Sequence, residues 1–148
     1  MFDAKDEVLN EIYRFIEATM VKGESVLVHS VKGQNRSCCV LAAYFMKKYR
    51  WTLYKTLEFL HARKPTLEIR SNFFTQLTNL ENHLAKLGQG AKTFNWNELS
   101  DDPKNIESEE LLLTNTFLNS KKPAPIDIVD SPSPKKGNIV LLCLRLIW

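Results

Sequence analysis

A chain of 148 residues with 44% hydrophobic residues can bury the core of one globular domain, with room for a tail. Its formal net charge of +3 is too small to argue for nucleic-acid binding by itself. No apolar run approaches the ~20 residues that a membrane-spanning helix needs, and the charged N-terminal region is not typical of a signal peptide. The three cysteines have no metal-ligand spacing, so we expect a reducing, intracellular setting and no metal or cofactor.

The first periodic segment, residues 6–22, predicts a helix. Its apolar residues fall on one face at helical spacing and are Leu9, Ile12, Tyr13, Ile16 and Met20. Asp3 or Asp6 can cap its start, and Gly23 is typical of a helix end.

A continuous apolar run over residues 25–29 predicts a β-strand that is buried on both faces, as in a parallel sheet. A short polar loop follows, and then an almost uninterrupted apolar helix from Ser37 to about Arg50. Backbone N–H groups of such a loop and of the helix N-terminus can point at one anion, and the Arg36 guanidinium can bind two phosphate oxygens at once. The residues predicted to bind phosphate are Ser30, Val31, Lys32, Gly33, Gln34, Asn35, Arg36 and Ser37.

Two further helices are predicted. Thr52 is a natural N-cap for a helix that ends before Pro65, and its apolar face is formed by Leu53, Leu57 and Leu60. Residues 72–87 form the second, closed by Gly88. Its apolar positions are Phe73, Leu77, Leu80, Leu84 and Leu87.

The periodicity fades after residue 88. A leucine run at 111–113 can start a short helix, whereas residues 121–138 are rich in Pro, Ser and Lys and predict disorder. The almost wholly apolar residues 139–148 allow three interpretations: a strand that pairs with residues 26–28, an alternative ending of a longer protein, or an aggregation-prone segment. We favour the second.

The loop also resembles a family signature. Protein tyrosine phosphatases, and most closely the dual-specificity branch, carry His-Cys, five further residues and Arg-Ser/Thr, and here His29, Gly33, Arg36 and Ser37 match. The resemblance covers about residues 7–87. It implies an α/β fold: the C-terminal part of a dual-specificity phosphatase-like domain, mostly helical, with one core strand leading into a phosphate-binding loop. Residues 1–88 would be this partial domain, and residues 89–148 a largely disordered tail with an apolar end.

The departures from the family pattern concern the chemistry. Ser30 stands where the family has its nucleophilic cysteine, and a serine hydroxyl is a far weaker acid than the thiol that forms the phosphocysteine. The family's general acid is an upstream aspartate, and the nearest candidates, Asp3 and Asp6, are more typical of helix caps. The resemblance implies that His29 is packed and holds the loop, and that Ser37 keeps a hydrogen bond to the loop.

Four other positions complete the comparison with the family. Cys38 lies inside the helix, where its sulfur is expected to point away from the anion site, and with Cys39 it is predicted to be a small buried residue. Ile69 and Arg70 replace the family's Pro-Asn pair, so the loop-bracing role of that asparagine is not expected here.

Three functions are consistent with this sequence. The favoured hypothesis is a catalytically inactive phosphatase-like protein that binds a phosphorylated protein, or a partner kinase or phosphatase, without hydrolysis. The second is an active dual-specificity phosphatase in which Ser30 is an engineered replacement of cysteine. The third is a truncated interaction fragment that binds no phosphate. In each case we expect no nucleic-acid partner, no membrane span and a cytoplasmic or nuclear location.

Overall fold

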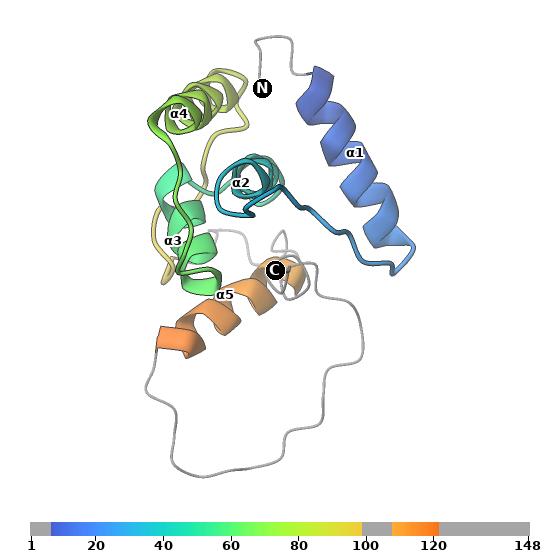
Figure 1. Ribbon diagram of the computed structural model, residues 1–148. Helices are drawn as coiled ribbons and strands as arrows, with labels where there is room; N and C mark the ends of the chain where they lie inside the picture. Colours follow the sequence, from blue (N-terminus) through green and yellow to red (C-terminus); the bar gives the residue numbers. More distant parts are fainter. Residues whose placement is uncertain (1–6, 99–107, 122–148) are drawn as a thin grey trace.

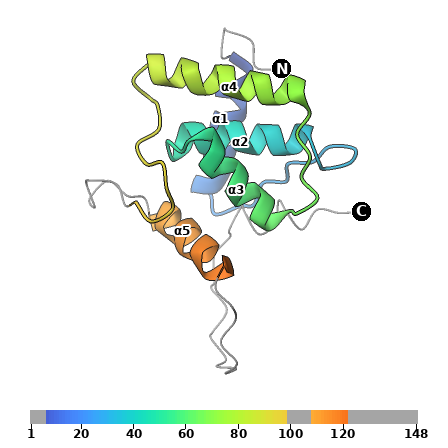
Figure 2. The ribbon, with the colours of Figure 1, turned by 90° about the vertical axis from the view of Figure 1, so that its left-hand side faces the viewer.

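The computed structural model describes residues 7–98 and 108–121 of the chain. Helix α2 lies at the centre, and α1, α3 and α4 surround it (Figure 1). Viewed from the side, α4 runs above α2, while α5 lies below α3 on the side away from α4 (Figure 2). The helices are α1 Glu7–Val21, α2 Arg36–Lys48, α3 Leu53–Arg63, α4 Ser71–Lys86 and α5 Ser108–Lys121. The mostly helical fold class is therefore confirmed.

Helix α2 is the core of the molecule because its sequence is apolar on nearly every side. Every residue from Ser37 to Met46 except Val40 is buried. A helix that is apolar all round needs neighbours on all sides to cover it, and α1, α3 and α4 supply them. Lys47 and Lys48 stand in its last turn, where positive charge complements the helix dipole.

Helix α1 packs on α2 through the predicted apolar face. Leu9 and Ile16 are buried, and the other predicted positions pack against the same core. Gly23 adopts a positive φ of 72° and its N–H donates to Met20 O, which is typical of a glycine that closes a helix. The predicted caps Asp3 and Asp6 lie outside the described residues.

The start of α3 is capped as predicted, because the Thr52 hydroxyl accepts a hydrogen bond from Lys55 N at 3.1 Å. The predicted apolar face of α4 is confirmed at its buried leucines, Leu77, Leu80 and Leu84. Leu87 is an exception, since the helix ends at Lys86 and Leu87 is 55% exposed in the turn that follows.

Residues 24–30 lead from α1 into the loop before α2 as an extended connection (Figure 1). The predicted core strand at 25–29 is not formed within the described residues, where the isolated bridge between Trp51 and Thr93 is the one β pairing. A strand needs a neighbour to take up its backbone hydrogen bonds, and the described ranges supply none beside this segment.

The packed body extends further along the chain than the predicted boundary at residue 88. Trp96 and Phe117 are 7% and 1% exposed, and both join an aromatic cluster with Trp51 and Phe59. Helix α5, which contains the leucine run predicted to start a short helix, is 14 residues long. These residues are ordered because large aromatic side chains bury apolar area. Such burial needs no periodic spacing of apolar residues in the sequence. The predictions for residues 122–148 lie outside the described residues.

None of the helices in the part of the chain that the structure describes is long and apolar enough to span a membrane.

Candidate functional site

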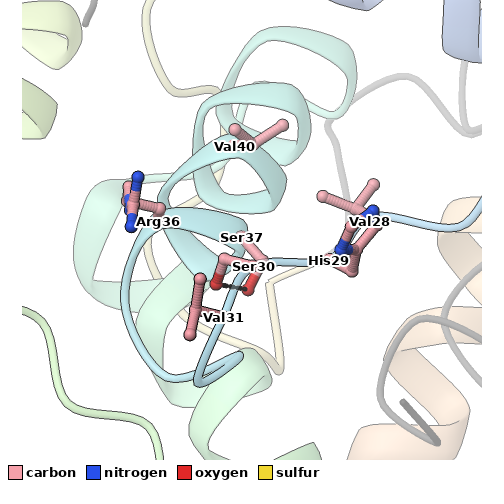
Figure 3. Close-up of a pocket in the computed structure, with 7 residues that line it drawn as sticks. All are labelled: Val28, His29, Ser30, Val31, Arg36, Ser37 and Val40. Carbon is pink, nitrogen blue, oxygen red and sulfur yellow. Dashed lines mark hydrogen bonds between the residues drawn. The ribbon is translucent and has the colours of Figure 1, made fainter. Parts of the chain in front are cut away.

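The predicted anion loop borders a pocket of about 340 Å³. The pocket lies between residues 28–31 and the first turns of α2 (Figure 3). Its walls are formed by Val28, His29, Ser30, Val31, Arg36, Ser37 and Val40. Of the eight residues predicted to bind phosphate, the structure therefore brings Ser30, Val31, Arg36 and Ser37 to one cavity, whereas residues 32–35 form the part of the loop outside it.

The loop has the local geometry that its single glycine allows. Gly33 has a φ of 60°, in the left-handed region that glycine adopts without steric cost. Its N–H donates to Ser30 O at 3.1 Å and closes a tight turn. Helix α2 then begins at Arg36, and the first of its turns is closed by Cys39 N donating to Asn35 O at 3.0 Å. This turn sets Arg36 at the N-terminus of α2, as predicted.

A second segment braces the loop from the α3–α4 connection. Glu68 N donates to Gln34 O at 3.1 Å. Glu68 directly precedes Ile69 and Arg70, the two residues that stand where the family has its Pro-Asn pair. Sequence reasoning missed this contact because both groups belong to the backbone, so no side-chain type signals it.

The two serines of the site are hydrogen-bonded to one another. Ser30 Oγ and Ser37 Oγ are 3.1 Å apart (Figure 3), and Ser37 is 6% exposed. This confirms the predicted hydrogen bond between Ser37 and the loop. In the described structure the partner of the Ser30 hydroxyl is thus another hydroxyl, which is no base strong enough to take its proton.

Two potentially cationic side chains lie at the rim of the pocket. Arg36 and His29 are both exposed, and Figure 3 shows them on opposite sides of the Ser30–Ser37 pair. The prediction that His29 is packed is wrong. A packed histidine would need a layer of structure over the segment at 25–29, and no described strand lies there.

The two cysteines of α2 lie beneath the loop rather than in the pocket. Both are buried, as predicted. The Cys38 thiol is 3.4 Å from Gly33 O and donates to it from the buried side of the loop. Burial raises the pKa of Cys38 above its ordinary value, and raises the pKa of Cys39 to about 12. Both thiols are therefore protonated at neutral pH, and neither lines the pocket.

No set of three or more His, Cys, Asp or Glu side chains among residues 7–98 and 108–121 is placed to hold a metal ion. The groups that line the described cavity are of kinds that can attract an anion. The site offers a helix N-terminus, hydroxyl groups and an exposed guanidinium around one cavity.

Among known proteins, the relatives of this chain are phosphatases. Residues 3–83 match the family model "Dual specificity phosphatase, catalytic domain". The chain is 29% identical over 125 residues to protein phosphatase Slingshot of Drosophila melanogaster, covering 84% of this chain and 10% of that protein. It is 36% identical over 72 residues to dual specificity protein phosphatase 1 of Arabidopsis thaliana, covering 49% of this chain and 36% of that protein.

A third relative is protein phosphatase Slingshot homolog 2 of Homo sapiens, 28% identical over 112 residues, with 76% of this chain and 8% of that protein covered. The chain thus spans between about a twelfth and about a third of the length of these relatives. No solved structure gives a significant match. Because the family model matches more than half of its residues, this chain belongs to the dual-specificity phosphatase family.

Proposed function

We propose that this protein binds a phosphorylated protein through residues 30–37 and does not hydrolyse the phosphoester. One observation carries the proposal. Ser30 occupies the position of the family's nucleophile and pairs its hydroxyl with Ser37, while Arg36 remains exposed at the N-terminus of α2. The site thus keeps the groups that attract a phosphate and lacks the group that attacks it.

The binding part of the proposal follows from charge and backbone geometry. The first N–H groups of a helix have no partners inside the helix, and they favour anions. Arg36 stands at that end of α2 and can donate two parallel hydrogen bonds to a phosphate. Lys32, exposed on the loop, adds a second positive charge. Gly33 gives the loop the turn that directs its backbone toward α2.

The proposed absence of turnover follows from Ser30, the residue at the position of the family's nucleophile. Thiolate formation is what lets the family react at neutral pH, and a serine hydroxyl needs a base to do the same. The described partner of Ser30 Oγ is the Ser37 hydroxyl, at 3.1 Å. Cys38 and Cys39 offer no substitute, because burial keeps both thiols protonated. The candidate general acids Asp3 and Asp6 lie outside the described residues.

The test is a titration with a phosphopeptide, with the unphosphorylated peptide measured alongside. We expect Arg36→Ala to weaken binding of the phosphopeptide by roughly tenfold to a hundredfold, the cost of losing a charge-assisted hydrogen bond of about 1.5–3 kcal/mol. Arg14→Ala is the matched control, because Arg14 is exposed on α1 and does not line the pocket. Its affinity should equal that of the wild type.

Turnover is assayed on the same samples. The wild type should release no phosphate under conditions in which an active family member does. Release of phosphate by the wild type would contradict the inactive part of the proposal. Equal binding of the phosphorylated and unphosphorylated peptides, or equal affinity of the wild type and Arg36→Ala, would contradict the binding part.

A further inference from the structure

His29 shares the pocket with Arg36, although its place in the family signature suggested a packed residue. It is exposed, and it lines the cavity with Ser30 and Ser37. Figure 3 shows His29 and Arg36 on either side of the two hydroxyl groups. The side chains that line this one cavity thus include an arginine that is always charged and a histidine that can take up a proton.

We propose that protonated His29 is a second cationic ligand of the anion, so that the site binds a doubly charged oxyanion more tightly at acidic pH. The inference rests on the proposed phosphate-binding function. It adds a residue outside the predicted set of residues 30–37, and it makes the affinity of the site depend on pH.

The charges around the pocket support this dependence. Arg36 from α2 is the permanently charged residue among the described residues that line the cavity, and Lys32 lies on the loop outside it. No Asp or Glu is among the lining residues in the part of the chain that the structure describes. An imidazolium in this pocket therefore shares the cavity with the positive charge of Arg36 and with no carboxylate of the described lining residues. A bound dianion removes the repulsion between these two positive charges and attracts the proton, so binding of the anion and of the proton favour each other.

The exposure of His29 separates a role in binding from a role in stability. Replacing a packed histidine would leave a cavity or an unpaired buried group, whereas replacing an exposed side chain changes the free energy of unfolding little. His29→Gln should therefore fold as the wild type does. Thermal unfolding followed by circular dichroism checks this before any binding is compared.

The experiment is a titration of the full chain with sulfate, measured by calorimetry at about pH 5.5 and at about pH 8, either side of the range in which histidine ordinarily titrates. Sulfate keeps both negative charges at these two pH values, whereas phosphate does not, so a change in affinity reports on the protein. We expect the wild type to bind sulfate about fivefold more tightly at the lower pH, the effect of one exposed charge worth ~1 kcal/mol.

Two variants complete the test. His29→Gln should lose most of the increase in sulfate affinity at the lower pH. His61→Gln is the matched control, since it removes an exposed histidine on α3 that does not line the pocket. It should keep the full increase.

The possible results separate this inference from the function on which it rests. Sulfate binding with the same affinity at both pH values in the wild type overturns the role of His29 and leaves the proposed function standing. The same holds if His29→Gln keeps the full pH dependence. No sulfate binding at either pH overturns both.

Discussion

A small polar network lies within the apolar interface between α1 and α2. The Tyr44 hydroxyl, on a side chain that is 1% exposed, donates to Glu17 Oε1 at 2.5 Å. Lys48 Nζ approaches the same oxygen at 2.8 Å. Burial is the main cause that raises the pKa of Tyr44 above its ordinary value, and the carboxylate of Glu17 adds to it. The tyrosine is therefore a fixed hydrogen-bond donor at any physiological pH.

This network predicts the effect of removing one atom, the hydroxyl oxygen of Tyr44. Tyr44→Phe removes the donor to Glu17 and should lower the free energy of unfolding by about 1–2 kcal/mol, because a hydrogen bond to a charged group is lost in a buried place. Urea unfolding measures the change. Tyr54→Phe is the control, since Tyr54 is 74% exposed and its variant should match the wild type. Equal midpoints for both variants would contradict a stabilising role of the network.

At the scale of the element, α3 shows how tertiary contacts complete what the local sequence begins. The Thr52 hydroxyl caps the helix by accepting a hydrogen bond from Lys55 N, three residues further along the sequence. Another N–H of the first turn, Leu53 N, donates to Glu81 Oε1 of α4 at 2.8 Å. Two N–H groups that have no partner inside the helix are thus satisfied, one by a neighbour in sequence and one by a neighbouring helix.

Removal of the Thr52 cap is predicted to lower the free energy of unfolding. Thr52→Ala should cost about 1 kcal/mol, since alanine cannot accept the hydrogen bond from the helix start. The chemical denaturation midpoint measures it. Thr75→Ala deletes the same hydroxyl from an exposed position inside α4, where it bonds to Ser71 O of its own helix. That control should change the free energy of unfolding by less than about 0.5 kcal/mol, and a similar loss in both variants would argue against the cap.

At the scale of the whole molecule, an aromatic cluster joins distant parts of the chain. The rings of Trp51 and Trp96 are 4.9 Å apart between centroids, and those of Trp96 and Phe117 are 4.0 Å apart. Lys55, 2% exposed, places its ammonium 4.9 Å from the Trp96 ring and donates to Thr93 Oγ1 at 2.9 Å. Desolvation lowers the pKa of this lysine. These contacts dock residues 93–98 and α5 onto α3.

The docking of α5 therefore depends on Phe117. Phe117→Ala should lower the free energy of unfolding by about 3–5 kcal/mol, a large part of the stability of a small domain. Thermal unfolding measures the loss. Leu112→Ala is the control on the same helix, because Leu112 is 44% exposed. If Phe117→Ala melted at the temperature of the Leu112→Ala variant, α5 would not be part of the cooperative unit.

Several features could be predicted from the sequence because they are local. The helices α1 to α4, the Thr52 cap and the glycine after α1 follow from patterns within a few residues, and each is confirmed. The family could be recognised from His29 to Ser37, because the signature is contiguous in the chain, and the family match confirms it. That residues 30–37 bind phosphate stays a prediction.

Other features depended on contacts between residues far apart in the sequence. The exposure of His29, the bond from Glu68 to Gln34 and the docking of Trp96 and Phe117 depend on which segments meet in space. A local pattern fixes backbone conformation and an apolar face, because both arise from neighbours in the chain. It does not fix what covers a side chain, and the packed structure alone decided that His29 lines the same pocket as Arg36.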